Sequence, residues 1–281
     1  MLTSPARRRT MDVRVWPTML WETFRRDVRI SLTYRLAFVL RFLSTLFQVA
    51  VFYFISKLVT GPQPGLDHYE GGYFAYALIG LAFMRLFNIS LSGYAGMLTE
   101  SQQMGTLEAQ ALLPVPLPLL IFGANLWPYL YAFGETLLYL LLGLALGAPL
   151  AGANVPAALV VAVLASMAIS GLGLMGAALI LVFKRGNAVS WAVEAAAALL
   201  AGVYFPPQLL PQPVQKLSLL LPHTYALAGL RGALLNGDPF TKLLPSLLAL
   251  LAFTLLLMPL GVIALAWALK QAQSKGNLAQ Y

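Results

Sequence analysis

The chain has 281 residues, of which 59% are hydrophobic and 10% charged, and its formal net charge is +8. Soluble domains carry about 25% charged residues, so this composition excludes a soluble globular protein and predicts a bilayer as the solvent. The absence of cysteine excludes disulfides, thiolate metal sites and cysteine nucleophiles, and the two histidines, His68 and His223, are too far apart to predict a metal site.

The first 36 residues are strongly basic and are expected to form a cytoplasmic segment. Basic residues beside a span set its orientation and meet anionic headgroups, so we do not expect nucleic-acid binding. Within this segment, residues 17–35 are expected to form an amphipathic helix, with Trp21 and Phe24 on one arc and Arg25 and Arg29 on the other. Such a helix lies in the headgroup region, and a solvated lead-in helix is the alternative.

Six apolar segments approach or exceed the length of about 20 residues that a membrane span needs. We therefore predict an all-α integral membrane protein whose six-span domain covers residues 37–269, followed by a tail at 270–281. The six expected spans are 37–59, 73–98, 118–148, 155–183, 188–205 and 243–269.

The distribution of Lys and Arg predicts the orientation. With the N-terminus in the cytoplasm, 13 basic residues lie inside and 4 lie outside, and Arg85 falls within a span. Both termini, the 99–117 loop and the 184–187 turn are then cytoplasmic, and the 206–242 region is outside. The inner set comprises Arg7, Arg8, Arg9, Arg14, Arg25, Arg26, Arg29, Arg35, Arg41, Lys184, Arg185, Lys270 and Lys275; the outer set comprises Lys57, Lys216, Arg231 and Lys242.

The loop at 99–117 contains a short polar stretch between two long apolar segments. From Glu100 to Glu108 it has two carboxylates and neither Lys nor Arg. A cytoplasmic loop of this kind offers a soluble partner a docking surface, which favours a membrane subunit driven by another polypeptide.

The region 206–242 is semi-apolar and is interrupted by prolines, which break helices. Two short helices dipping into the outer leaflet, in re-entrant fashion, fit this pattern. A catalytic histidine needs a nucleophile and an orienting acid, and neither is identifiable beside His223, so no catalytic residue is predicted.

Three ionisable residues fall within predicted spans: Arg85, Glu135 and Glu194. Charge in the bilayer costs roughly 2.5–3.5 kcal/mol per group, so such residues usually face the protein interior and pair. Arg85 and Glu135 are near the middle of consecutive antiparallel spans and are expected to be able to meet. Either a structural ion pair or a substrate or proton path accounts for these charges.

Two glycine patterns bear on nucleotide binding. The sequence from Gly171 to Gly176 spells G-x-G-x-x-G, but it lies inside an apolar run without the strand that a dinucleotide site needs, so we interpret it as a helix-packing surface of small residues. The sequence has no G-x-x-x-x-G-K-[ST] loop; if ATP drives this chain, another polypeptide binds it.

Three stretches together resemble the permease subunits of ABC-2-type transporters. The first is Glu100…Met104-Gly105-Thr106-Leu107-Glu108…Pro114, the second is Gly202-Val203-Tyr204-Phe205-Pro206, and the third is Leu221-Pro222-His223-Thr224-Tyr225…Arg231. Ala111 departs from the leucine-rich run expected in the first stretch. With the six spans and the N-terminal helix, the resemblance covers nearly the whole chain.

The resemblance implies a coupling role for Glu100, Gly105, Thr106, Leu107 and Glu108, and an outer re-entrant motif containing Pro222, Thr224, Tyr225 and Arg231. It also implies two ATPase subunits that bind ATP and Mg²⁺, and a second permease copy, identical or different. The expected function is export of a hydrophobic or amphipathic molecule, drug-like or lipid, across the cytoplasmic membrane. Export of a lipid-linked glycan or polysaccharide, and an ion- or proton-coupled secondary transporter using Arg85, Glu135 and Glu194, are the alternatives.

Overall fold

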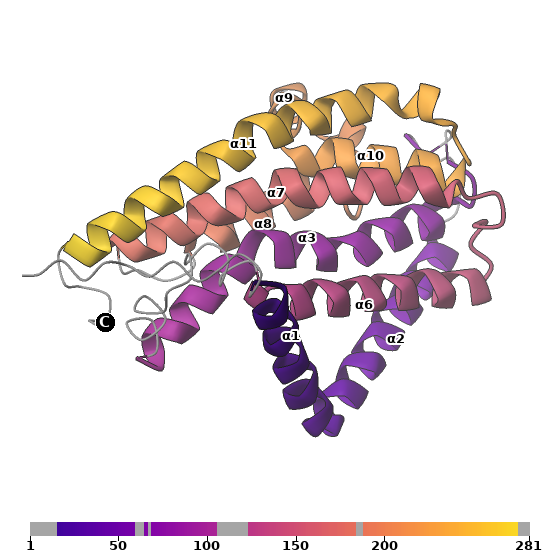
Figure 1. Ribbon diagram of the computed structural model, residues 1–281. Coiled ribbons are helices and arrows are strands. Elements are labelled where there is room, and N and C mark those ends of the chain that lie inside the picture. The colour runs from indigo at the N-terminus through magenta and orange to yellow at the C-terminus, as the bar shows by residue number, and fades with distance from the viewer. Residues whose placement is uncertain (1–15, 60–64, 67–68, 106–122, 184–187, 275–281) are drawn as a thin grey trace, which may run out of the picture.

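The computed structural model describes residues 16–59, 65–66, 69–105, 123–183 and 188–274, and every regular element in these ranges is a helix (Figure 1). Five helices are long and apolar enough to cross a membrane, namely α2 (Arg35–Leu58), α3 (Gly72–Gln103), α6 (Leu126–Ala145), α7 (Val155–Phe183) and α11 (Phe240–Ser274). The shorter elements are α1 (Trp16–Thr33), α8 (Ala188–Leu200), η2 (Pro207–Leu209), α9 (Gln212–Ser218) and α10 (Pro222–Leu235). The predicted all-α membrane fold is confirmed.

The fifth predicted span, 188–205, is present as the shorter helix α8. Its 13 residues extend about 20 Å at 1.5 Å per residue, less than the hydrocarbon thickness of about 30 Å. The apolar sequence continues beyond Leu200, but Gly202 has φ 78°, a left-handed conformation that a helix does not accommodate. The chain therefore turns at 201–205 before the proline-rich segment begins.

Helix α3 forms the centre of the bundle, with α7 on one side and α6 on the other (Figure 1). Most of its apolar stretch is buried. The α7–α11 contact is the most extensive, and small residues permit it: a Cβ on Gly171 would lie 2.4 Å from the backbone carbon of Leu257, and one on Gly261 would lie 2.5 Å from the Gly171 carbonyl oxygen. Gly173 meets α3 in the same way, because its Cβ would lie 2.4 Å from the Ser90 carbonyl oxygen. The interpretation of the glycine pattern as a packing surface is confirmed.

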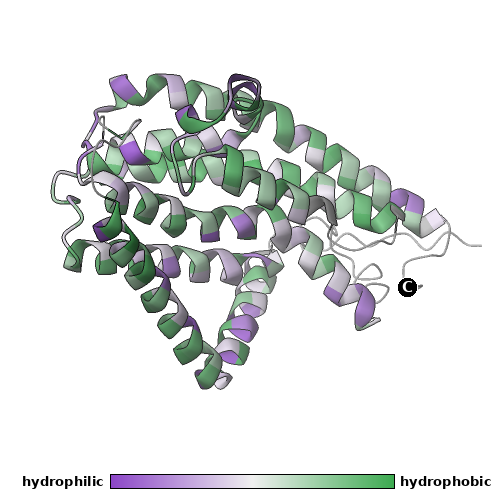
Figure 2. Ribbon diagram, turned by 180° about the vertical axis from the view of Figure 1, so that it is seen from behind, coloured by the Kyte–Doolittle hydropathy of each residue, from purple (hydrophilic) through white to green (hydrophobic). Residues whose placement is uncertain are grey.

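Helices α1 and α2 meet at Tyr34 and diverge from there as a V (Figure 1). Only a small part of α2 is buried, although it is strongly apolar. Helix α1 is fixed to α6 by the Trp127 indole, which donates a 2.6 Å hydrogen bond to Ser31 Oγ and contacts the Phe24 ring. The expected helix at 17–35 is thus present, and its hydrophilic residues contrast with the apolar long helices (Figure 2).

The expected short helices of the 206–242 region are α9 and α10. Pro222 occupies the first turn of α10, where the missing amide proton costs nothing. Most of α10 is buried against α7, α11 and α3. Protein therefore covers α10, as a membrane requires for a buried segment, whereas η2 and α9 are largely exposed.

Candidate functional site

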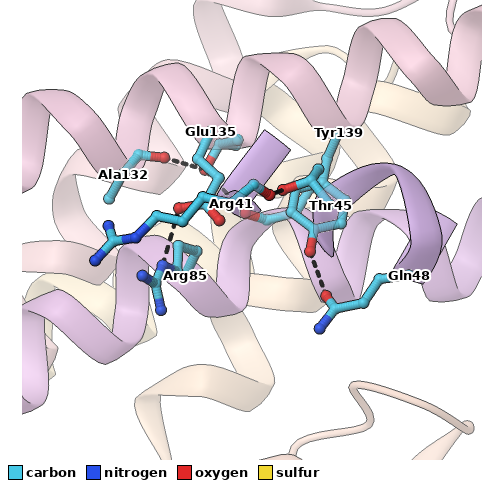
Figure 3. A network of polar contacts seen from close by, with 9 residues as sticks. Arg41, Thr45, Gln48, Arg85, Ala132, Glu135 and Tyr139 are labelled. Atoms are coloured by element: carbon cyan, nitrogen blue, oxygen red, sulfur yellow. Dashed lines mark hydrogen bonds and ion pairs between the residues drawn. The ribbon is translucent and has the colours of Figure 1, made fainter. Parts of the chain in front are cut away.

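An ion pair joins α3 to α6 in the middle of the bundle. Arg85 Nε lies 2.9 Å from Glu135 Oε2, so the two side chains that were expected to be able to meet are in contact (Figure 3). Two further polar contacts lie beside this pair on α6: Thr136 Oγ1, the next residue, donates to the Ala82 carbonyl of α3 at 2.8 Å, and one turn later the Tyr139 hydroxyl donates to Gln48 Oε1 on α2. Three helices converge on this cluster.

Arg41 on α2 is a second cation beside this cluster (Figure 3). Its guanidinium carbon lies 5.1 Å from the centre of the Tyr131 ring, a cation–π contact. Within the described ranges, Arg41 forms no ion pair, and Glu135, which lines the same cavity, is paired with Arg85. The group of Arg41, Arg85 and Glu135 therefore has one positive charge in excess.

Two cavities meet at Arg41. The first, of about 670 Å³, lies between α2 and α6, and apolar side chains such as Phe42, Leu137 and Leu141 form most of its wall. The second, of about 490 Å³, lies among α1, α2, α3 and α6 and is lined by both Arg41 and Arg85. Both cavities are lined by Phe38, Arg41, Trp127 and Tyr131. The shared wall makes one continuous region with an apolar part and a cationic part.

Glu194, the third predicted intramembrane charge, lies apart from this pair. Its carboxylate accepts a hydrogen bond from the Ser92 hydroxyl on α3. Ser92 is seven residues beyond Arg85 on the same helix, about 10 Å along its axis. The structure therefore does not bring Glu194 into contact with Arg85 or Glu135.

The predicted coupling loop begins where α3 ends. The helix reaches Gln103, and Gly105 follows with φ 66°, which suits glycine and ends the helix. Glu100 is exposed and lines a cavity of about 640 Å³ together with Arg26 and Asp27 of α1. Thr106, Leu107 and Glu108 lie outside the described residues.

Arg231, from the predicted outer motif, is a buried tether with only 2% of its surface exposed. It donates hydrogen bonds to the carbonyls of Tyr76 at 3.2 Å and Gly202 at 2.7 Å, and its guanidinium carbon lies 3.4 Å from the centre of the Tyr76 ring. The Tyr76 hydroxyl also donates to the Gly202 carbonyl, at 2.9 Å. One side chain of α10 thus binds α3 and the turn after α8.

The other residues of the outer motif support the same part of the fold. Pro222 begins α10, the Thr224 hydroxyl donates a 2.6 Å hydrogen bond to the Ser218 carbonyl of α9, and the Tyr225 ring packs against Phe253 of α11. Thr224 and Arg231 also line a polar cavity of about 450 Å³. These contacts hold α9 and α10 together as one structural unit.

The sequence did not reveal the role of Arg41. Its position near the start of a span suggested only a topological charge, and no local signal predicted that Tyr131 of α6 would lie beside it. The same holds for Ser92 as the partner of Glu194, since a serine in an apolar helix gives no such signal. In the described part of the chain, His, Asp and Glu nowhere gather in threes as a metal site needs.

Comparison with known proteins agrees with the helical membrane fold. A family model described as ABC-2 type transporter matches residues 14–235, from α1 to the end of α10. No curated protein matches the chain. The family match covers most of the 281 residues. The chain therefore belongs to the ABC-2 type transporter family, as a multi-pass permease subunit of an ABC transporter.

Proposed function

We propose that this permease exports a hydrophobic or amphipathic molecule, drug-like or lipid, from the cytoplasm, powered by separate ATPase subunits that bind ATP and Mg²⁺. The observation that carries the proposal is the cavity of about 670 Å³ between α2 and α6, whose wall is mostly apolar and includes the polar side chains of Arg41, Thr45 and Glu135. Apolar pockets with a few placed polar groups are typical of small-molecule sites. A lipid-linked glycan is the less favoured substrate, because its polymer would need a long polar channel.

The coupling mechanism follows from the length of α3. This helix runs from Gly72 to Gln103, about 48 Å at 1.5 Å per residue, so it extends beyond a bilayer core of about 30 Å. An ATPase bound at Glu100, Gly105 and the following Thr106–Glu108 would push on the end of a continuous helix. The displacement reaches the Arg85–Glu135 pair, and through it α6, without an intervening hinge.

The proposal includes two permease copies and two ATPase subunits in the cytoplasmic membrane, with both termini inside. The weakly buried helix α2 supports it, because its apolar faces are open in a single chain. Identical copies are the simplest arrangement, and a heterodimer is the alternative. The separation of Glu194 from the Arg85–Glu135 pair argues against a secondary transporter, which would need these charges connected along one path.

The test is purification of the chain after co-expression with the ATPase encoded beside its gene. The expected result is co-elution of the two chains in equal amounts, with vanadate-sensitive ATP hydrolysis. A functional permease that purifies alone, and whose transport collapses with a proton uncoupler but not with vanadate, would overturn the proposal.

A further inference from the structure

The two cavities that share Arg41, here called the double cavity, are together complementary to an anionic amphiphile, because one is mostly apolar and the other is cationic. Its cationic part is lined by Arg41 and Arg85 and includes the Tyr34 and Ser31 side chains, and no Asp or Glu is among its lining residues. The only described carboxylate near these cations, Glu135, is bonded to Arg85. An uncompensated guanidinium in a membrane protein is expensive, so an anion that reaches Arg41 gains a charge-assisted contact.

The apolar part continues from the cationic part in one direction. Along α6 it is lined from Leu130 to Leu141, eleven residues or about 16 Å, which is close to half of a hydrocarbon core of about 30 Å. Glu135 is the one acidic residue in this lining, and its carboxylate is bonded to Arg85. With the expected topology, α6 begins at the cytoplasmic side. The apolar wall then runs from the inner interface toward the bilayer centre, as the acyl chains of an inner-leaflet lipid do.

The depth of the cationic part fits a lipid phosphate. Arg41 is six residues into α2, about 9 Å from its start, a distance that a long arginine side chain spans toward the interface. Trp127 lines the same region, and tryptophan is enriched at the level of the headgroups. Both observations place Arg41 at the border between acyl chains and headgroups.

We propose that this double cavity is the loading site for a phosphate-bearing, lipid-like substrate arriving from the inner leaflet, with its phosphate at Arg41 and its chain along α6. The proposal rests on the proposed function and names the substrate class. Arg85 keeps Glu135 neutralised, so that Arg41 remains available to the phosphate.

The test is native mass spectrometry of the purified chain in detergent, with phosphatidylglycerol and diacylglycerol of identical acyl chains, of which only the first carries a phosphate. We expect phosphatidylglycerol to be preferred about fivefold, the contribution of one basic residue to an anionic headgroup. Arg41→Gln removes the preference, whereas Arg35→Gln, a control on the same helix outside both cavities, retains it. Equal binding of the two lipids, or an unchanged preference in Arg41→Gln, would overturn the assignment of the phosphate.

Two glycines provide a matched test of the apolar part. Gly134 lines the cavity, and a Cβ added to it meets nothing within 4 Å; the same is true of Gly96 on α3, which lies outside the cavity. We expect Gly134→Phe to reduce the binding of both lipids severalfold and Gly96→Phe to leave it unchanged. Displacement of the bound lipid by millimolar inorganic phosphate alone would show that the acyl chain of the lipid does not contribute to binding, and would overturn this part of the proposal.

A final measurement separates a substrate from a resident lipid. In the complex with its ATPase, reconstituted in nanodiscs, phosphatidylglycerol is expected to stimulate ATP hydrolysis in the wild type and not in Arg41→Gln. Lipid binding without such stimulation would make the site a resident-lipid site and overturn the proposed substrate. Binding is measured without the ATPase, so loss of the lipid preference and failure to find an ATPase partner are distinct results.

Discussion

Arg85 Nε and Glu135 Oε2 lie 2.9 Å apart and connect the consecutive long helices α3 and α6. The Arg85 side chain is 44% exposed and that of Glu135 is 13% exposed in the single chain, so the pair is anchored by its carboxylate. The contact lies in the walls of the cavities beside α6, because Glu135 lines the larger cavity and Arg85 lines the other, so it joins α3 to both cavities.

Removing one member of the pair is expected to destabilise the protein. Glu135→Gln leaves Arg85 without an acid, and we expect a loss of about 1–2 kcal/mol, less than for a fully buried pair because the guanidinium is partly exposed. Thermal unfolding in detergent measures this loss. The double variant Arg85→Gln with Glu135→Gln leaves no lone charge and should be more stable than Glu135→Gln alone; the reverse order would contradict a pairwise interaction.

The proposed coupling role of the loop after α3 can be tested by removing its two carboxylates. Glu100→Ala combined with Glu108→Ala is expected to lower substrate-stimulated ATP hydrolysis about tenfold, since hydrogen bonds to charged groups contribute roughly 1.5–3 kcal/mol, without loss of membrane insertion. Glu70→Ala, an exposed carboxylate before the other end of α3, is the matched control. Unchanged stimulation in the double variant would remove the coupling assignment.

Because α7 and α11 are closely packed, we expect that adding a single methyl group at Gly171 destabilises the protein. In Gly171→Ala the new Cβ would lie 2.4 Å from the Leu257 backbone, so the helices must separate, and we expect a loss of about 1–3 kcal/mol. In Gly134→Ala the new Cβ meets nothing within 4 Å, so helix propensity should raise the stability slightly. Equal melting temperatures for the two variants would show that α7 and α11 are not closely packed there.

The tether formed by Arg231 predicts a graded series. Arg231→Met abolishes its contacts with the Tyr76 and Gly202 carbonyls and is expected to cost more than about 2 kcal/mol, while Tyr76→Phe loses one hydrogen bond and should cost about 1 kcal/mol. Arg231→Lys should not restore stability, because an ammonium cannot reproduce the planar guanidinium. Full stability of Arg231→Lys, measured by thermal unfolding, would mean that charge alone holds this region.

Most of the helices could be predicted because an apolar run long enough to cross a bilayer has few other structures available to it. The fifth predicted span was longer than α8, since hydropathy does not register the left-handed φ of Gly202. Hydropathy placed the end of the second span at 98, and α3 continues beyond it to Gln103, because the polar residues after the apolar run are also compatible with a helix. Boundaries thus depend on backbone conformation more than on apolarity.

The site was predictable only in part, for a different reason. Arg85 and Glu135 could be paired because two opposite charges near mid-span in adjacent helices have a strong reason to meet. The contact between Arg41 and Tyr131 depends on the angle at which α2 leaves the bundle, and the carbonyl partners of Arg231 depend on the turn at 201–203. The spacing of residues in the sequence predicts neither this angle nor this turn.

The uneven burial of the helices divides the chain by how readily its parts move. Helices α3, α7, α10 and α11 interlock through close glycine contacts and the Arg231 tether, so displacing any one of them exposes surface on the others. Helix α2 has little buried surface, so moving it would expose little, and α1 is joined to α6 mainly through Trp127. Because local opening is easiest where the fewest apolar contacts are lost, the α1–α2 arm has the lowest barrier to reorientation. A swing of the α1–α2 arm against the block of α3, α7, α10 and α11 would widen or narrow the space beside α6.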